Sequence, residues 1–187
     1  MASLILHPTS IAQWHALLNE AQQCSSIYLK EDIESYLVFL LMRFTEEPNV
    51  VSSILGLDFL KICQPNSLIH QQQQLKEVGD KCLLFAGLFP GRAARRRVKL
   101  SYYVKLGQTA YSTLSSNLIS QEELFNRLCN QFPKLTDVLH AMRETSPSAQ
   151  NLLQTLEWWH ETHSPVAWNK LCKGTKSLPS PFNFKKH

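Results

Sequence analysis

A run of cationic side chains lies near the middle of the chain, and it is the first place where chemistry is expected. Four of its members follow the spacing i, i+3, i+4 and i+7, so one or two helical turns would place them on a single face. The cluster consists of Arg92, Arg95, Arg96 and Lys99, with the flanking Arg97 and the surface tyrosine Tyr102. A helix that starts near residues 98–101 adds the partial positive charge of its N-terminal N–H groups. Such a cluster predicts a site for an anion or an acidic partner.

The anion can come from inside or outside the fold, and the sequence leaves both sources open. The internal candidates are the surplus carboxylates Glu31, Asp32, Glu34, Glu46 and Glu47. The external candidates are a phosphate, a nucleic acid and an acidic protein surface. We expect the cluster to divide. Arg96 or Arg97 would serve an internal pair, whereas Arg92, Arg95 and Lys99 would stay in water.

Other residues with chemical potential lack the companions that they need. Glu157 and His160 have the Glu-x-x-His spacing of di-iron helical bundles, but the sequence holds no second copy of that motif. The five cysteines include no Cys-x-x-Cys pair, which argues against a zinc site and a disulfide framework and favours reduced thiols. Neither a phosphate-binding glycine loop nor a Gly-x-Ser-x-Gly elbow is present. No catalytic residue, metal or cofactor is therefore predicted.

The elements that must position the cationic cluster are predicted to be helices. Apolar residues recur at spacings of three and four along almost the whole chain, and runs of strict alternation are missing. We therefore expect an all-α, single-domain bundle of about eight helices over residues 1–173, with an extended or flexible tail over residues 174–187. One shorter helix is expected around residues 50–60.

Capping residues and prolines predict where several of these helices start or are interrupted. Thr9 and Ser10 are placed to cap the first helix, and Ser164-Pro165 reads as the cap and first residue of the last one. Pro133 lies inside an apolar pattern and is expected to bend or break it.

The apolar stripes predict which faces are buried. The first helix is expected to bury Ile11, Trp14, Leu17, Leu18 and Ala21, and the helix from residue 68 to 89 is expected to bury Leu68, Leu75, Val78, Cys82, Phe85, Ala86 and Phe89. Trp159 is assigned to the core, as are Tyr103 and Tyr111. Gly107 interrupts a helix at a buried position, which indicates a close approach of a neighbouring helix. Leucine should be destabilising there, and alanine near neutral.

Composition and charge bound the class of protein. The chain has 187 residues and a formal net charge of +4, which suits one compact domain. Residues 1–90 hold five Lys and Arg against nine Asp and Glu, whereas residues 91–187 hold fourteen against six, so the two halves have opposite charge. No apolar run approaches the length of a membrane span, and the N-terminus lacks the features of a secretory signal. We expect a cytoplasmic protein without a membrane partner.

The passage from residue 79 to residue 111 also resembles the sequences of a family of bacterial, proteobacterial helical proteins. The pattern consists of Gly79-Asp80, Gly87-Leu88-Phe89, Arg96-Arg97-Val98, Tyr102-Tyr103, Gly107 and Ala110-Tyr111. It covers about a sixth of the chain. The resemblance implies a helical fold in a bacterial cytoplasm, and it carries over no activity, cofactor or catalytic residue.

These observations favour a non-enzymatic interaction or regulatory module that docks an acidic protein partner through the cationic cluster. The alternative is a nucleic-acid-binding protein that uses the same surface, although the modest net charge weakens it. A second alternative, from the enzyme class, is a helical domain that encloses a small ligand between its helices. The sequence does not determine the oligomeric state.

Overall fold

The computed structural model describes residues 9–46, 68–89, 98–118, 121–144 and 152–174. These residues form seven helices and no strand, which confirms the all-α prediction. The helices are α1 (Ser10–Ser25), α2 (Glu31–Glu46), α4 (Leu68–Leu88), α6 (Leu100–Asn117), α7 (Glu122–Glu144), α8 (Leu152–Thr162) and α9 (Pro165–Gly174). Among them, none has the length and apolar content required to cross a bilayer. The helix expected around residues 50–60 lies outside the described residues, as does the tail expected over residues 174–187, except that Gly174 is the last residue of α9.

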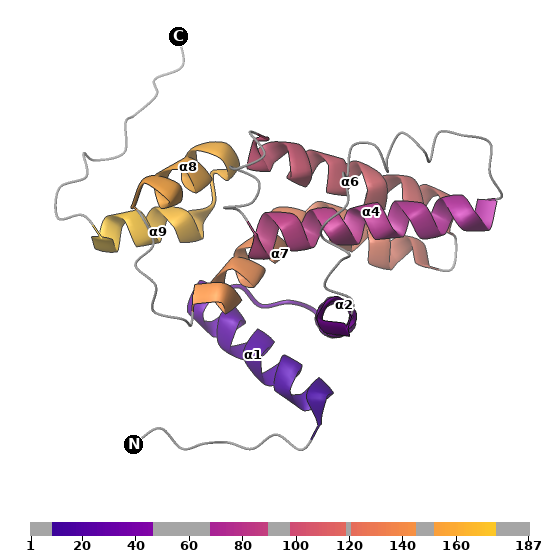
Figure 1. Cartoon of the computed structure of the whole chain (residues 1–187), viewed down its shortest axis with the longest axis horizontal. Coiled ribbons are helices and arrows are strands. Elements are labelled where there is room, and N and C mark those ends of the chain that lie inside the picture. Colours follow the sequence, from indigo (N-terminus) through magenta and orange to yellow (C-terminus); the bar gives the residue numbers. More distant parts are fainter. Residues whose placement is uncertain (1–8, 47–67, 90–97, 119–120, 145–151, 175–187) are drawn as a thin grey trace, which may run out of the picture. The chain divides into compact units, whose positions relative to one another are not determined.

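The chain divides into two compact units, residues 1–147 and residues 148–187. In the first unit the long helices α4, α6 and α7 lie side by side, and α6 runs opposite to the other two (Figure 1). Most of the core comes from these three helices. Its largest fully buried side chains include Tyr111, Phe85, Phe125 and Phe132.

Glycines bring these three helices into close contact. A Cβ atom on Gly79 of α4 would lie 2.5 Å from Cε1 of Tyr111 on α6, and one on Gly87 would lie 2.5 Å from Cβ of Leu139 on α7. Both distances are far below ordinary van der Waals contact, so a side chain at either glycine would push the helices apart. We name the three helices joined in this way the α4–α6–α7 body.

Helix α7 continues through Pro133, so of the two expected outcomes, a bend or a break, the break does not occur. A proline has no N–H group, and the carbonyl four residues earlier therefore loses its helical donor. That carbonyl belongs to Cys129, and it accepts a hydrogen bond from Nε2 of Gln108 on α6 at 3.2 Å. The side chain of a neighbouring helix thus replaces the missing backbone donor.

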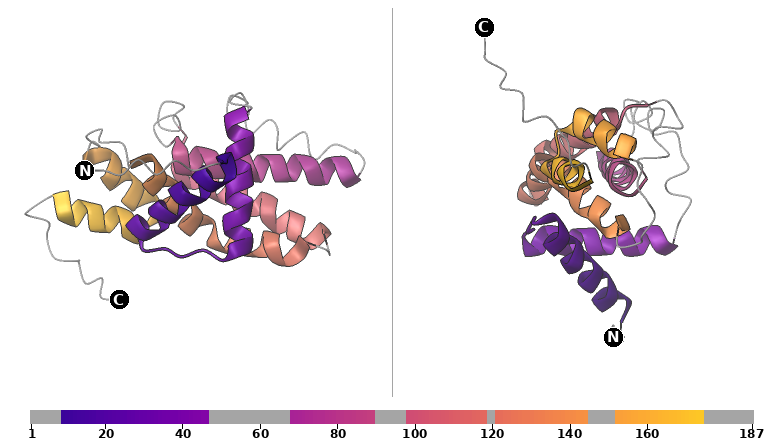
Figure 2. Two further views of the ribbon diagram at one scale, coloured as in Figure 1. Left: turned by 90° about the horizontal axis from the view of Figure 1, so that it is seen from below. Right: turned by 90° about the vertical axis from the view of Figure 1, so that its left-hand side faces the viewer.

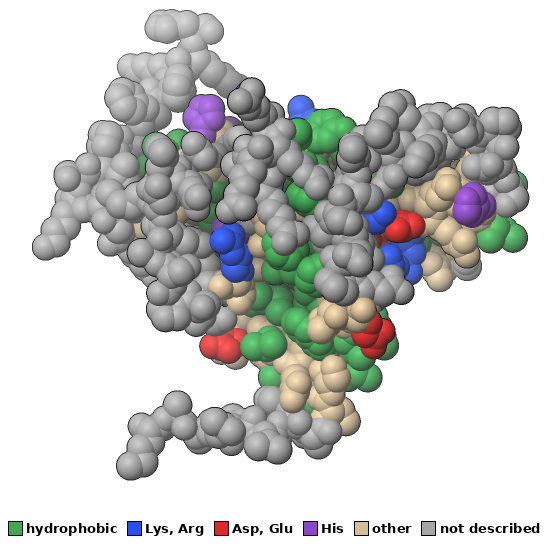
Figure 3. Space-filling view, in the orientation of Figure 1, with side chains coloured by type: hydrophobic (Ala, Val, Ile, Leu, Met, Phe, Trp, Pro, Cys, Tyr) green, Lys and Arg blue, Asp and Glu red, His purple; other side chains and the backbone are tan. Residues whose placement is uncertain are grey.

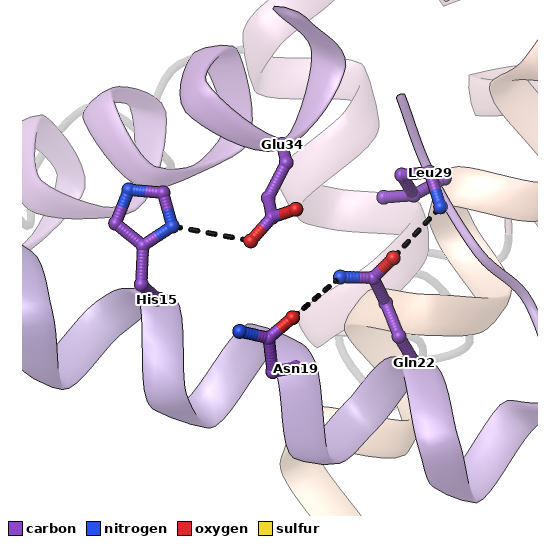
Figure 4. A network of polar contacts seen from close by, with 5 residues as sticks. All are labelled: His15, Asn19, Gln22, Leu29 and Glu34. Carbon is purple, nitrogen blue, oxygen red and sulfur yellow. Dashed lines mark hydrogen bonds and ion pairs between the residues drawn. The ribbon is translucent and has the colours of Figure 1, made fainter. Parts of the chain in front are cut away.

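Helices α1 and α2 contact each other at an inclined angle and are joined by a short connection (Figure 2). Thr9 caps α1, as predicted, because its Oγ1 accepts a hydrogen bond from the N–H of Ala12 at 3.2 Å. Beyond the last turn, the N–H of Leu29 donates to Oε1 of the buried Gln22 at 2.7 Å (Figure 4). Nδ1 of His15 lies 3.1 Å from Oε1 of Glu34, across the two helices (Figure 4).

Helix α2 runs across the α4–α6–α7 body (Figure 2). Its apolar face is buried, and several longer side chains contact the body; the buried residues are Ile33, Leu37, Val38, Leu40 and Leu41. The Phe44 ring packs edge-on against Phe89 of α4 at a centroid distance of 5.6 Å, and Asp32 pairs with Arg127 of α7. Tyr36 and Arg43 also reach the body from α2, at the buried carboxylate of Asp80.

Two predicted stripes are buried only in part. Leu18 and Ala21 of α1 are buried, whereas Ile11 is 42% and Leu17 is 43% exposed. In α4, Leu68 is 75% exposed and Phe89, directly after the helix, is half-buried, although the same stripe is buried from Leu75 to Ala86. Hydrophobic side chains are visible over α1 and α2 in Figure 3. Trp14 of α1 is also half-buried. These corrections lie toward the ends of the two predicted stripes, where the described neighbours no longer cover the apolar face completely.

The second unit is a pair of short helices. Ser164 caps α9 and Pro165 is its first residue, as predicted, with the N–H of Ala167 donating to Oγ of Ser164 at 3.3 Å. Trp159 was expected to be buried but is only half-buried, whereas its neighbour Trp158 is buried. Trp159 packs on Trp168 of α9 at a centroid distance of 4.9 Å.

Candidate functional site

Two of the six predicted docking residues lie among those that the structure describes. Lys99 is the N-cap residue of α6, and Tyr102 lies in the first turn of that helix. The other four, Arg92, Arg95, Arg96 and Arg97, lie outside the described residues. Their assignment therefore stays a prediction.

The start of α6 presents a cationic and an aromatic side chain to solvent. Lys99 is exposed, and Tyr102 is 44% exposed, as expected for a surface tyrosine. The first turn of α6 contains no acidic residue, and the side chain of Lys99 does not cap the helix. The charge of Lys99 therefore adds to the positive end of the helix dipole.

Of the four described carboxylates that were expected to neutralise the cationic cluster, two pair with other residues, whereas Glu31 and Glu46 are exposed. Asp32 pairs with Arg127, and Glu34 pairs with His15. Within the described segments, Lys99 forms no ion pair. These contacts favour a Lys99 that stays in water.

A second polar site lies at the centre of the first unit, around Asp80 of α4. This aspartate is only 2% exposed. Its Oδ1 accepts a hydrogen bond from the hydroxyl of Tyr36 on α2 at 2.5 Å and another from the hydroxyl of Tyr111 on α6 at 2.8 Å. One carboxylate oxygen thus joins three helices. Phe125 of α7 packs against both tyrosine rings.

Two cations lie near this carboxylate, and both are on the solvent side. Nη1 of Arg43 is 3.7 Å from Oδ2 of Asp80, and the Arg43 side chain is 41% exposed. Nζ of the exposed Lys76 lies 5.5 Å from the centroid of the Tyr36 ring. Solvent screens both positive charges, so they compensate the buried charge only in part.

Burial raises the pKa of Asp80 above its ordinary value, because an ionised carboxylate loses its hydration inside the protein. The hydroxyls of Tyr36 and Tyr111 and the charges of Lys76 and Arg43 lower the pKa, and they offset only part of that rise. The pKa values of Tyr36 and Tyr111 are raised well above the ordinary value, mainly by burial and then by the Asp80 charge. Both phenols therefore remain hydrogen-bond donors at neutral pH.

This arrangement can hold a proton and can fix the positions of three helices. A catalytic group needs access to a substrate, and Asp80 is buried behind its two tyrosines. No three His, Cys, Asp or Glu side chains within the described part of the chain gather where they could hold a metal ion. We therefore do not assign a catalytic role to Asp80.

Sequence analysis missed the Asp80 site, although its members leave a signal. Asp80 and Lys81 are the two charged residues in the otherwise apolar run from residue 78 to residue 87. A charge on the buried face of a helix demands a partner. The sequence does not reveal that partner, because Tyr36 and Tyr111 lie 44 and 31 residues away from Asp80.

The structure gives a physical reason for several residues of the pattern between residues 79 and 111. Gly79 makes room for Tyr111, whose hydroxyl reaches Asp80. Tyr103 stacks on Phe85 at a centroid distance of 5.1 Å. A Cβ atom on Gly107 would lie 2.5 Å from Cε2 of Phe132, which confirms the expected close approach. Because even a methyl group would collide there, the geometry predicts that alanine is destabilising as well.

The comparisons add no relative to this account. No protein-family model, curated protein or solved structure matches the chain. The resemblance to a bacterial helical family therefore stays a prediction that is carried by the passage from residue 79 to residue 111.

Proposed function

We propose that this chain is a non-enzymatic interaction module that docks an acidic protein surface at the start of α6. The observation that supports the proposal is the exposed pair Lys99 and Tyr102 at the positive end of that helix. Lys105 is exposed on the same helix, less than two turns beyond Lys99, and it adds a second positive charge to this surface.

Tyr102 is suited to contact a partner because one side of its ring packs against a buried aromatic residue. It packs edge-on against Tyr103 at a centroid distance of 5.6 Å, and the buried Tyr103 stacks on Phe85 in the core. An aromatic side chain that is already ordered loses little conformational entropy on binding. Tyr102 can therefore supply apolar contact area while Lys99 supplies charge.

The proposal can be tested by NMR with the isotope-labelled full chain and an oligoglutamate peptide as the acidic probe. We expect the amide signals of Lys99 and Tyr102 to shift in a saturable, salt-sensitive way. Lys99→Glu should weaken binding about tenfold, since it replaces an attraction by a repulsion of similar size. Lys134→Glu is the matched control, because it makes the same charge change at an exposed position in the middle of α7.

The aromatic half of the site has its own control. Tyr102→Ala should weaken binding, whereas Tyr28→Ala should not, although Tyr28 is 78% exposed. Equal losses for Lys99→Glu and Lys134→Glu would show that the probe follows net charge alone, and the proposed site would be rejected. Tighter binding of a single-stranded oligonucleotide through the same residues would favour the nucleic-acid alternative instead.

A further inference from the structure

Helix α2 is joined to the α4–α6–α7 body in a different way from the joints within that body. Inside the body, Gly79, Gly87 and Gly107 let helices touch with no space for one additional carbon atom. Helix α2 instead reaches α4 through the ends of long side chains, namely Tyr36, Arg43 and Phe44. Long side chains can adapt to a small displacement more easily than a close helix contact can. Helix α2 also buries Ile33 and Leu37, but of the three helices that meet at Asp80 it is the one that no such glycine contact locks to the others.

Among the described residues, the charge on Asp80 is compensated only in part while α2 covers it. Lys76 of α4 is exposed, and its Nζ lies 5.5 Å from the centroid of the Tyr36 ring. Both strong hydrogen bonds, from Tyr36 and Tyr111, come from neutral hydroxyls and reach Oδ1. Oδ2 faces Arg43 at 3.7 Å, a distance longer than a hydrogen bond. On the α7 side the aromatic neighbour is Phe125, and Arg127 of that helix pairs with Asp32 and Glu123.

We propose that α2 closes over Asp80 in a proton-dependent way, so that α2 is held more tightly when the carboxyl group is neutral than when it is ionised. Opening α2 would remove Tyr36 and admit water to Asp80. Water stabilises a carboxylate far more than it stabilises a neutral carboxylic acid. Ionisation therefore favours the open arrangement, and protonation favours the closed one.

Thermodynamic linkage fixes the sign of this effect. Burial raises the pKa of Asp80 in the closed arrangement, and hydration in the open one would return it toward its ordinary value. Closure then takes up a proton, and the closing equilibrium weakens as the pH rises through the pKa of the closed form. Each unit by which the two pKa values differ changes the opening constant by up to about tenfold.

Hydrogen exchange of the full chain, corrected for intrinsic rates and measured across mildly acidic to neutral pH, tests the proposal. We expect the protection of α2 amides to fall with rising pH in the wild type. It should also stay below that of amides around Leu135 and Val138 in the core of α7, which exchange on global unfolding and therefore share the pH dependence of Asp80. In Asp80→Asn, which keeps an oxygen acceptor but cannot ionise, α2 protection should be independent of pH. Asp32→Asn is the matched control, because it removes a carboxylate from α2 that pairs with Arg127 and not with Asp80.

A second variant keeps the test decisive if Asp80→Asn does not fold. Tyr111→Phe removes a donor that lowers the Asp80 pKa but leaves every α2 side chain in place. The midpoint of the pH dependence in α2 should therefore move to higher pH. Protection of α2 that is constant or rises with pH in the wild type would overturn the proposal. So would a pH dependence that survives in Asp80→Asn, or one whose midpoint does not move in Tyr111→Phe.

Discussion

Replacing Gly107 by alanine tests how tightly α6 and α7 are packed. The new Cβ atom would lie 2.5 Å from Cε2 of Phe132 and 3.0 Å from Cβ of Cys82. Both neighbours are fully buried, so the Phe132 ring has no solvent-filled space into which it can withdraw. The helices or the ring must shift, and overpacking of this kind costs about 1 to 3 kcal/mol.

Helix propensity acts in the opposite direction at this position. Alanine is favoured over glycine by about 1 kcal/mol in a helix interior. Because the new Cβ would meet two buried neighbours, the overpacking cost should lie at about 2 to 3 kcal/mol, so the net destabilisation should be about 1 to 2 kcal/mol. Urea unfolding followed by circular dichroism measures the difference. Thr109→Ala is a control on the same helix, because its exposed side chain reports propensity without a collision in the core.

A double variant decides whether Phe132 causes the loss. Phe132→Leu removes the ring atoms nearest to the new Cβ, so Gly107→Ala should become close to neutral in that background. A Gly107→Ala protein as stable as the wild type would refute the close contact. An equal loss in both backgrounds would show that Phe132 is not the obstacle.

Three further outcomes follow from the polar contacts of the first unit. Tyr111→Phe should lower the free energy of unfolding by about 1 to 3 kcal/mol in urea melts, because the buried carboxylate of Asp80 loses one of its two hydroxyl donors. Phe125→Tyr, in the same cluster, supplies a donor to Asp80 only where its new hydroxyl reaches the carboxylate. Gln108→Ala should lower the free energy of unfolding by about 1 kcal/mol in the wild type and by much less in Pro133→Ala, where the backbone N–H of residue 133 can again reach the Cys129 carbonyl. Equal losses in both backgrounds would contradict this role of Gln108. The folded-state pKa of Asp80 is raised, so the stability that its protonation contributes is complete below the unfolded-state pKa and is lost as the pH rises through the folded-state pKa. The free energy of unfolding of the wild type, relative to that of Asp80→Asn, should therefore fall with rising pH. A rise would contradict the raised pKa of Asp80.

The sequence by itself determined the fold class and several local features. The spacing of apolar residues predicts helices because one face of each must be buried, and all seven described helices agree. The caps Thr9 and Ser164 were predictable because capping is a contact between residues three apart. The close approach at Gly107 was also predictable, since glycine in a buried helix face has a cost that needs a reason.

Only the tertiary structure decided which parts of those faces are covered and which distant residues meet. The periodicity of α1 identifies its apolar face, but the extent of the neighbouring helices leaves Ile11 and Leu17 exposed. The local rule for Pro133 does not include Gln108, which satisfies the Cys129 carbonyl from another helix. Asp80 acquires its partners in the same way. Hydrogen bonds to Tyr36 and Tyr111 depend on the packing of three helices, and a pattern that repeats every few residues contains no information about contacts 31 and 44 residues apart.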